Sequence, residues 1–179
     1  AHDLTGTILR GADLSYANLS GQDLSGKDLT DTILTTTNLS YTNLDGLDLS
    51  GRDLSYSNLT NVDLSGKDLT KTNFSVAKMH GVNLENTKIR DTKFQQTSFD
   101  DSLKKSDFDR AEGGGFSYTN LEGFDFSGIF LRNVSFIGAW LDGSDFSHSN
   151  LDGVRFALAN LSNANFEGAD LQKTLAYFV

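Results

Sequence analysis

The sequence has no cysteine and no proline, and among its 179 residues are one methionine and one tryptophan. Without cysteine, disulfides and thiolate metal sites are excluded, while the redox state of the compartment stays open. No apolar run approaches the roughly 20 residues of a membrane-spanning helix, so no membrane span is expected. No signal peptide is evident. The chain starts at Ala1, so a targeting segment removed earlier would leave no trace, and the localisation is unknown.

The charge is of one prevailing sign, with 24 acidic against 15 basic residues and a formal net charge of −9. Such an acidic chain is a poor match for direct binding to nucleic acid or to an anionic membrane, and it suits a protein partner, including a basic one. The sequence does not identify that partner.

What the sequence does have is a period of five. A large apolar residue, here called the centre, recurs at every fifth position: twenty times from Leu4 to Phe99 and twelve times from Phe116 to Leu171. Neither the helical period of 3.6 nor the strand period of 2 explains this spacing, so the chain must turn every five residues. Asp or Asn often precedes the centre (position −1), Ser or Thr follows it (+1), and Gly often stands at +2. Gly at +2 suits a turn with positive φ.

The repeat resembles the motif of the pentapeptide-repeat family: a small residue, Asp or Asn, Leu or Phe, and two variable residues. The resemblance implies an all-β fold, a right-handed quadrilateral β-helix with four repeats per coil, in which the centre and position −2 point inward. At the usual strand spacing, 179 residues would make about nine coils and a rod about 40 Å long. We expect one solenoid over 1–179, with a first repeat block at 1–99, an irregular loop at 100–115, a second block at 116–174 and a C-terminal cap at 175–179.

The interior should be filled by ladders of residues twenty apart. In the second block Phe and Leu alternate, so Phe116, Phe136 and Phe156 should stack on one face, and a second Phe ladder should stand opposite. Position −2 is charged at Lys27, Arg52 and Lys67. Because a buried unpaired charge is costly, we expect these side chains to bend outward and meet neighbouring carboxylates.

Between the two blocks the register slips by two residues, with Leu103 and Phe108 as the expected centres. The segment is either a tolerated insertion or a projecting loop that touches a partner, since loops on a rigid scaffold often carry binding. Arg110 and Glu112 are the candidate loop contacts.

Carboxylates also repeat every twenty residues. One column should consist of Asp28, Asp48 and Asp68, and Asp53 should lie on the adjacent face. These four residues are candidate partner-binding residues. Some relatives in the family are proposed to imitate DNA and to bind DNA gyrase or topoisomerase, the quinolone-resistance type. B-DNA carries one charge per roughly 1.7 Å, whereas this rod would carry one per about 4–5 Å. A DNA mimic is therefore weak, and a merely solvated acidic face is the competing interpretation.

Two further sets of apolar residues are candidates for contact with a partner. Apolar residues face outward at four places where the repeat usually has polar ones: Phe130, Ile137, Trp140 and Leu158. Ile137 and Trp140 flank one corner. The chain ends with an apolar segment that should cap the solenoid, and the resemblance implies that it can form a homodimer. Its candidate residues are Leu175, Tyr177, Phe178 and Val179. The start has no cap, which indicates a preceding domain or a covering chain.

Nothing in the sequence suggests catalysis. The three His residues are far apart in register and no nucleophile–base pair or metal cluster can be singled out, so we expect no enzyme, no metal and no cofactor. The sequence favours a non-catalytic structural or protein-interaction module that presents an elongated acidic surface. Two alternatives stay open: the DNA mimic, and a spacer domain of a larger effector or surface protein.

Overall fold

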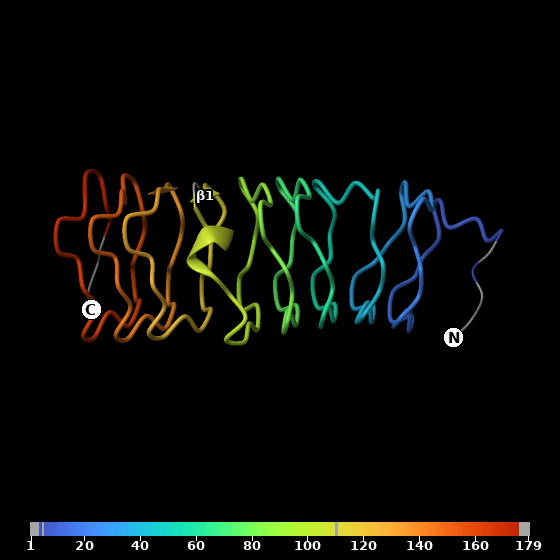
Figure 1. Cartoon of the computed structure of the whole chain (residues 1–179), viewed down its shortest axis with the longest axis horizontal. Coiled ribbons are helices and arrows are strands. Elements are labelled where there is room, and N and C mark those ends of the chain that lie inside the picture. The colour runs from blue at the N-terminus through green and yellow to red at the C-terminus, as the bar shows by residue number, and fades with distance from the viewer. Residues whose placement is uncertain (1–3, 5, 110, 176–179) are drawn as a thin grey trace.

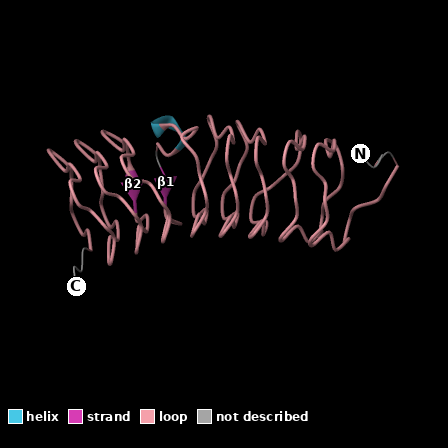
Figure 2. Cartoon of the chain, turned by 90° about the horizontal axis from the view of Figure 1, so that it is seen from below, coloured by secondary structure: helices cyan, strands magenta, loops and turns pink. Residues whose placement is uncertain are grey.

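The computed structural model describes residues 4, 6–109 and 111–175. The chain winds into coils that stack along one axis, with the two ends of the chain at opposite ends of the rod (Figure 1). Nearly all of it is turns and single β-bridges. The named elements are the 3₁₀ turn η1 (Lys105–Asp107) and the strands β1 (Ala111–Glu112) and β2 (Leu131–Arg132), which lie side by side (Figure 2).

The coils are held together by parallel bridges between residues twenty apart. Examples are Asp13 with Ile33, Asn38 with Asn58, and Asp145 with Asn165. At many levels the N–H of the centre donates to a carbonyl of the next coil, as from Leu19 to Asn38 at 2.8 Å. The fold is a right-handed quadrilateral β-helix, so the predicted fold class is confirmed.

The core consists of the centres, which are buried along most of the rod. Phe136 stacks between Phe116 and Phe156, with ring centroids 5.5 Å from each, as predicted. It meets Phe146 of the second ladder edge-to-face at 5.9 Å. Offset stacks within a ladder and edge contacts between ladders are both favourable for aromatic rings. This packing leaves the interior filled by side chains.

Position −2 points inward and carries a second, polar ladder. Hydroxyl groups at this position donate to the carbonyl of a centre in the preceding coil, as from Thr72 Oγ1 to Leu49 at 2.7 Å and from Thr92 Oγ1 to Leu69 at 2.7 Å. These bonds satisfy the hydroxyl of a buried side chain, which would otherwise be costly to bury.

The charged residues at position −2 also donate to the carbonyl of a centre in the preceding coil. Lys27 Nζ donates to the Leu4 carbonyl at 2.6 Å, and Lys67 Nζ donates to Leu44 at 2.8 Å. Arg52 donates through Nη1 to the Leu29 carbonyl at 2.8 Å. The prediction that these side chains pair with carboxylates was therefore wrong. Backbone carbonyls of the coil line position −2. A long cationic side chain reaches them there and does not need to bend outward to the carboxylates.

The register break is confirmed and involves two extra residues. Lys93 pairs with Gly115, 22 positions on, whereas bridges elsewhere join residues twenty apart. The extra chain forms η1, where the Asp107 carboxylate accepts the Lys104 N–H at 2.8 Å. Phe108 is fully buried and packs edge-on against Phe116 at 4.8 Å, while Leu103 is half-buried. The aromatic core thus continues through the break.

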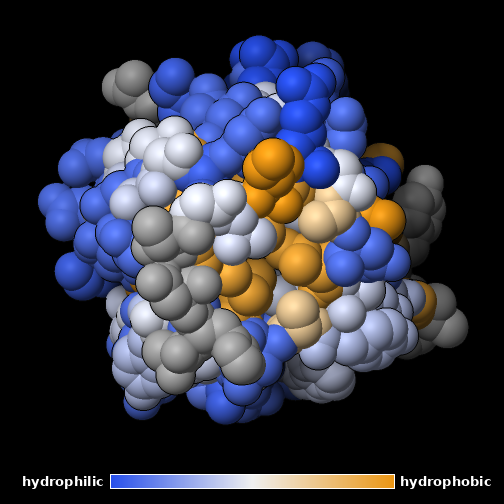
Figure 3. All heavy atoms as spheres, turned by 90° about the vertical axis from the view of Figure 1, so that its right-hand side faces the viewer, coloured by the Kyte–Doolittle hydropathy of each residue, from blue (hydrophilic) through white to orange (hydrophobic). Residues whose placement is uncertain are grey.

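Two observations concern the exterior of the rod. Seen from the end where the chain begins, apolar side chains fill the middle of the described coil and hydrophilic ones surround them (Figure 3). Among the residues that the structure describes, no helix is long and apolar enough to cross a membrane.

Candidate functional site

The carboxylates of the predicted acidic column serve the turns of their own repeats. All three are exposed, and each accepts a backbone N–H two residues further on: Asp28 from Thr30 (2.9 Å), Asp48 from Ser50 (2.9 Å) and Asp68 from Thr70 (3.0 Å). Hydrogen bonds from the side chain and then the amide of that Ser or Thr lower the pKa of each carboxyl. Asp53 likewise accepts the Ser55 N–H at 2.9 Å. Closing a turn explains these residues without a partner.

The acidic column is also short and bounded by cations. Arg10 lies 3.9 Å from Asp28 at one end, and Lys88 Nζ lies 3.3 Å from Asp68 at the other. Lys88 occupies the next place in the column, because it bridges directly to Asp68. The run of unbroken negative charge is therefore three residues long.

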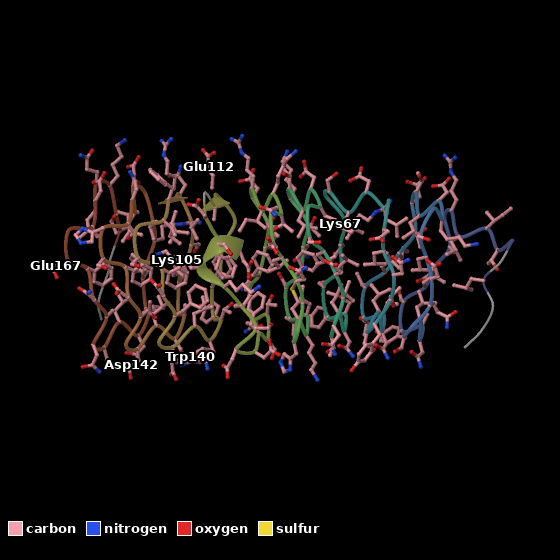
Figure 4. The ribbon with its side chains drawn as sticks, viewed as in Figure 1. Lys67, Lys105, Glu112, Trp140, Asp142 and Glu167 are labelled. Atoms are coloured by element: carbon pink, nitrogen blue, oxygen red, sulfur yellow. The ribbon has the colours of Figure 1, made fainter. Side chains whose placement is uncertain are left out.

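Glu112, one of the predicted loop contacts, belongs to a ladder of alternating charges at position +1. Arg90 lies 3.8 Å from Glu112, and Arg132 lies 3.6 Å from Asp152. In the register of β1 and β2, Glu112 stands beside Arg132, and it points away from the rod (Figure 4). The other predicted contact, Arg110, lies outside the described residues.

The predicted apolar residues divide between two faces. Phe130 is exposed and shares its column with Asn150, beside an open depression of about 330 Å³ that Glu112 and Arg132 also line. Trp140 is 48% exposed and points away from the rod on the side opposite Glu112 (Figure 4). Ile137 is half-buried near Trp140. The structure thus brings Ile137 and Trp140 to one corner and leaves Phe130 on another face.

The backbone geometry reveals a feature that the sequence reading missed. Outside the register break, position +2 of the described repeats has a positive φ, near +60°, which favours Gly and is tolerated by Asn and Asp. At three corners of the coil these residue types predominate. The fourth corner differs, and its eight successive residues are Tyr16, Thr36, Tyr56, Val76, Gln96, Tyr118, Gly138 and Leu158.

Large side chains at this corner oppose the backbone preference. For L-residues other than Gly the left-handed conformation costs roughly 1–2 kcal/mol, and it is especially unusual for a β-branched residue such as Val76. Three of these side chains stay largely exposed, Tyr16 at 82%, Tyr56 at 62% and Leu158 at 61%, while Tyr118 at 41% and Val76 at 38% are partly covered. Neither the turn nor the core therefore explains why Tyr, Val and Leu stand at this corner.

The residues on both sides of the corner are almost uncharged. We define the corner strip as 15–18, 35–38, 55–58, 75–78, 95–98, 117–120, 137–140 and 157–160. Hydrogen bonds join its successive levels, for example from Tyr56 N–H to Ser75 and from Tyr118 N–H to Ile137, both at 2.9 Å. The strip contains no Asp or Glu, although the chain has 24 such residues, and its one charged residue is Lys78.

The choice of Asn over Asp strengthens this observation. Position −1 on the strip is Asn at five levels, and the amide oxygen closes the turn as a carboxylate does elsewhere: Asn18, Asn38, Asn58, Asn120 and Asn160. Three of them form a ladder, with Nδ2-to-Oδ1 distances of 3.1 and 3.2 Å. The ladder favours Asn at its two donors, Asn38 and Asn58, because a carboxylate cannot donate the Nδ2–H bond. At Asn18, Asn120 and Asn160, where Asp would close the turn equally well, turn formation does not account for the missing negative charge. Aligning the sequence in columns of twenty would have revealed the strip.

Two other predictions concern metals and the C-terminus. Among the described residues, no cluster of three or more His, Cys, Asp and Glu side chains could hold a metal ion. Leu175 is exposed and pairs with Arg155 at the last described level. The other candidate dimer residues, Tyr177, Phe178 and Val179, lie outside the described part of the chain, so the C-terminal interface stays a prediction.

Comparison with known proteins agrees with this geometry. The family model for pentapeptide repeats matches eight copies, over residues 2–26, 12–51, 57–96, 116–149 and 140–175. HetL, a pentapeptide repeat protein involved in heterocyst differentiation regulation from the cyanobacterium Nostoc sp. strain PCC 7120, is a similar solved structure. Its TM-score is 0.52 at 24% identity, with 96% of this chain and 90% of HetL covered.

A second similar structure is a trypsin-treated variant of QnrB1, described as a plasmid-mediated fluoroquinolone resistance protein. It has a TM-score of 0.53 at 14% identity, with 94% of this chain and 85% of QnrB1 covered. At such identities the likeness concerns the fold alone. Comparison with curated protein sequences gives no match.

Proposed function

The chain belongs to the pentapeptide repeat family, and from this premise we propose that it is a non-catalytic structural and protein-interaction module that binds its partner through the corner strip. Proteins of this family are generally non-catalytic, and they commonly mediate protein interactions. The rigid stack supplies a long, straight edge on which side chains repeat at the spacing of the coils.

One observation carries the proposal: bulky apolar side chains gather at the left-handed positions of one corner of the four, at five of its eight levels, whereas Tyr41 is the one such residue that the structure describes at the other corners. A residue that opposes the backbone preference and remains exposed contributes little to folding, so binding is the role that explains it. Trp140 supports the same surface, because it stands where neighbouring levels have the turn-closing Asn120 and Asn160. Tyr and Trp supply large contact areas at low conformational-entropy cost, which is why they are enriched in protein interfaces.

The acidic columns support a DNA mimic less well. Their carboxylates close their own turns, and Lys88 interrupts the negative column at Asp68. A DNA gyrase supercoiling assay tests this alternative directly, since a mimic should inhibit the enzyme or protect it from a quinolone. A spacer role within a longer protein is tested by the full reading frame and by deletion of the solenoid.

The corner strip can be tested with matched tyrosine variants. Tyr118 lies in the strip, whereas Tyr41 is an exposed left-handed tyrosine at another corner. Replacing either with Asn relieves similar backbone strain. The immobilised wild-type protein should capture a partner from cells that produce it, Tyr118→Asn combined with Trp140→Asn should lose that partner, and Tyr41→Asn should retain it. Equal capture by all three proteins would contradict the proposal.

A further inference from the structure

We propose that the occupant of the corner strip is a second copy of this chain, so that two solenoids associate side by side along their rods. This inference rests on the proposed function, because it assigns a partner to the same surface. It differs from the predicted dimer at the C-terminus, which would join the rods at their ends.

The distribution of charge over the rod favours a second copy as the occupant. Two copies that each carry a net charge of −9 repel one another wherever carboxylates meet. The other three corners carry Asp or Glu, such as Asp28, Asp142 and Asp152, whereas the corner strip has none. A basic partner would be recognised by retained carboxylates, not by their removal. A neutral surface spares an acidic partner this repulsion, and another copy of this chain is an acidic partner.

The side chains of the strip also suit a symmetric, self-complementary interface. In a two-fold dimer the same surface is used by both copies and must complement itself. The apolar residues of the strip can pack against the same residues of a second copy. The Ser, Thr and Asn beside them can pair across the interface, because hydroxyls and amides both donate and accept hydrogen bonds. The Asn18, Asn38 and Asn58 ladder is such a surface.

The size of the strip also bears on its occupant. The strip runs through eight levels of the rod, from Tyr16 to Leu158. Seven spacings between coils give a length of about 34 Å, and four extended residues across the strip span about 13 Å, so the strip covers roughly 450 Å² per copy. That area is about half of the roughly 800 Å² per partner of a standard-size protein interface. It therefore suits a weak homodimer that forms at high protein concentration.

Sedimentation velocity on the purified chain, from micromolar to hundreds of micromolar, measures the association. We expect a concentration-dependent dimer in the wild type. Tyr56→Asn and Tyr118→Asn should each raise the dimer dissociation constant about tenfold or more, as for central interface residues. Tyr41→Asn should leave it unchanged. Because Asn tolerates the left-handed backbone, thermal unfolding should show that all three variants remain folded.

Cross-linking locates the contact, and the absence of native cysteine makes it specific. Gln95 lies in the strip near its middle, and Glu85 lies on the same coil at the opposite corner; both are exposed. A short bismaleimide should link two copies of Gln95→Cys, while the matched control Glu85→Cys should stay unlinked.

Four results would overturn the proposal. The first two are a wild type that is monomeric at every concentration, and a dimer that the Tyr variants do not weaken. The other two are a dimer lost with Leu175→Asp but not with the Tyr variants, and equal cross-linking at both cysteines. If the wild type is monomeric but its captured partner is lost with Tyr118→Asn and Trp140→Asn, only the identity of the occupant is wrong. If the capture is also unaffected, the proposed function fails as well.

Discussion

Replacing Lys67 tests whether a cation at position −2 is held by the backbone or by carboxylates. Lys67 Nζ donates to the Leu44 carbonyl at 2.8 Å, and that carbonyl also accepts the Leu47 N–H at 3.2 Å. In Lys67→Met the stem remains but the donor is lost, while the carbonyl keeps one partner. A hydrogen bond from a charged donor contributes roughly 1.5–3 kcal/mol. Since Lys67 is only half-buried, we expect a loss near the lower value.

A loss of about 1.5 kcal/mol lowers the Tm of a chain of this size by roughly 3–6 °C. Circular dichroism at low and at high salt measures the shift. Lys67→Thr is the matched control, because Thr at the equivalent position donates to the corresponding carbonyl, as Thr72 does to Leu49 at 2.7 Å. We therefore expect Lys67→Thr to unfold close to the wild type.

Salt distinguishes the two explanations. A bond to a backbone carbonyl inside the coil is little affected by ions, whereas pairing with exposed carboxylates is screened. The Tm difference between wild type and Lys67→Met should therefore persist at high salt. If it disappears there, Lys67 acts through surface charge, and our reading of position −2 is wrong.

Four further outcomes follow from the structure. Phe136→Ala removes a fully buried ring from the middle of a stack and should cost about 3–5 kcal/mol in urea unfolding. Tyr56→Asn should raise the free energy of unfolding by up to about 1 kcal/mol, since it relieves a left-handed tyrosine. Gly114→Ala places a Cβ on the Thr92 carbonyl oxygen and should markedly lower the Tm. Turn-closing carboxyls such as Asp48 have a lowered pKa in the folded chain. Their stabilisation should be present above about pH 4 and lost as pH falls below it, measured by urea unfolding at each pH.

The fold and the core could be predicted because the five-residue period leaves few alternatives. The centres, the Phe116 to Phe156 ladder and the break before Gly115 all follow from counting positions. The contacts of Lys27 and Lys67 could not be predicted by counting positions. They depend on the direction of backbone carbonyls within the coil, which the identity of the side chains does not reveal.

The candidate surface was predicted only in part. Ile137, Trp140 and Leu158 were visible as apolar residues in polar positions, but the rest of the corner strip was not, because Tyr16 and Tyr118 are distant in sequence. Their shared corner appears only when the sequence is aligned in columns of twenty, and the structure adds that both have a positive φ, 61° and 57°. The acidic columns drew attention for the opposite reason: Asp is conspicuous in the repeat even where it only closes a turn.

Each position of the repeat has its own structural role, and these roles determine which residues of this protein can be substituted. Two of the five positions fill the core, one closes the turn with its side chain, and one must accept a left-handed backbone. Position +1 is the freest, and −1 and +2 accept other residues at some levels, as Trp140 and Tyr56 show, so the chain can vary its exterior by at least about four residues per coil. Binding specificity is consequently determined by residues twenty apart, which lie next to one another along the axis, and not by consecutive residues. A linear peptide cut from this sequence should therefore be unable to compete with the intact rod, however long it is, unless it folds into coils.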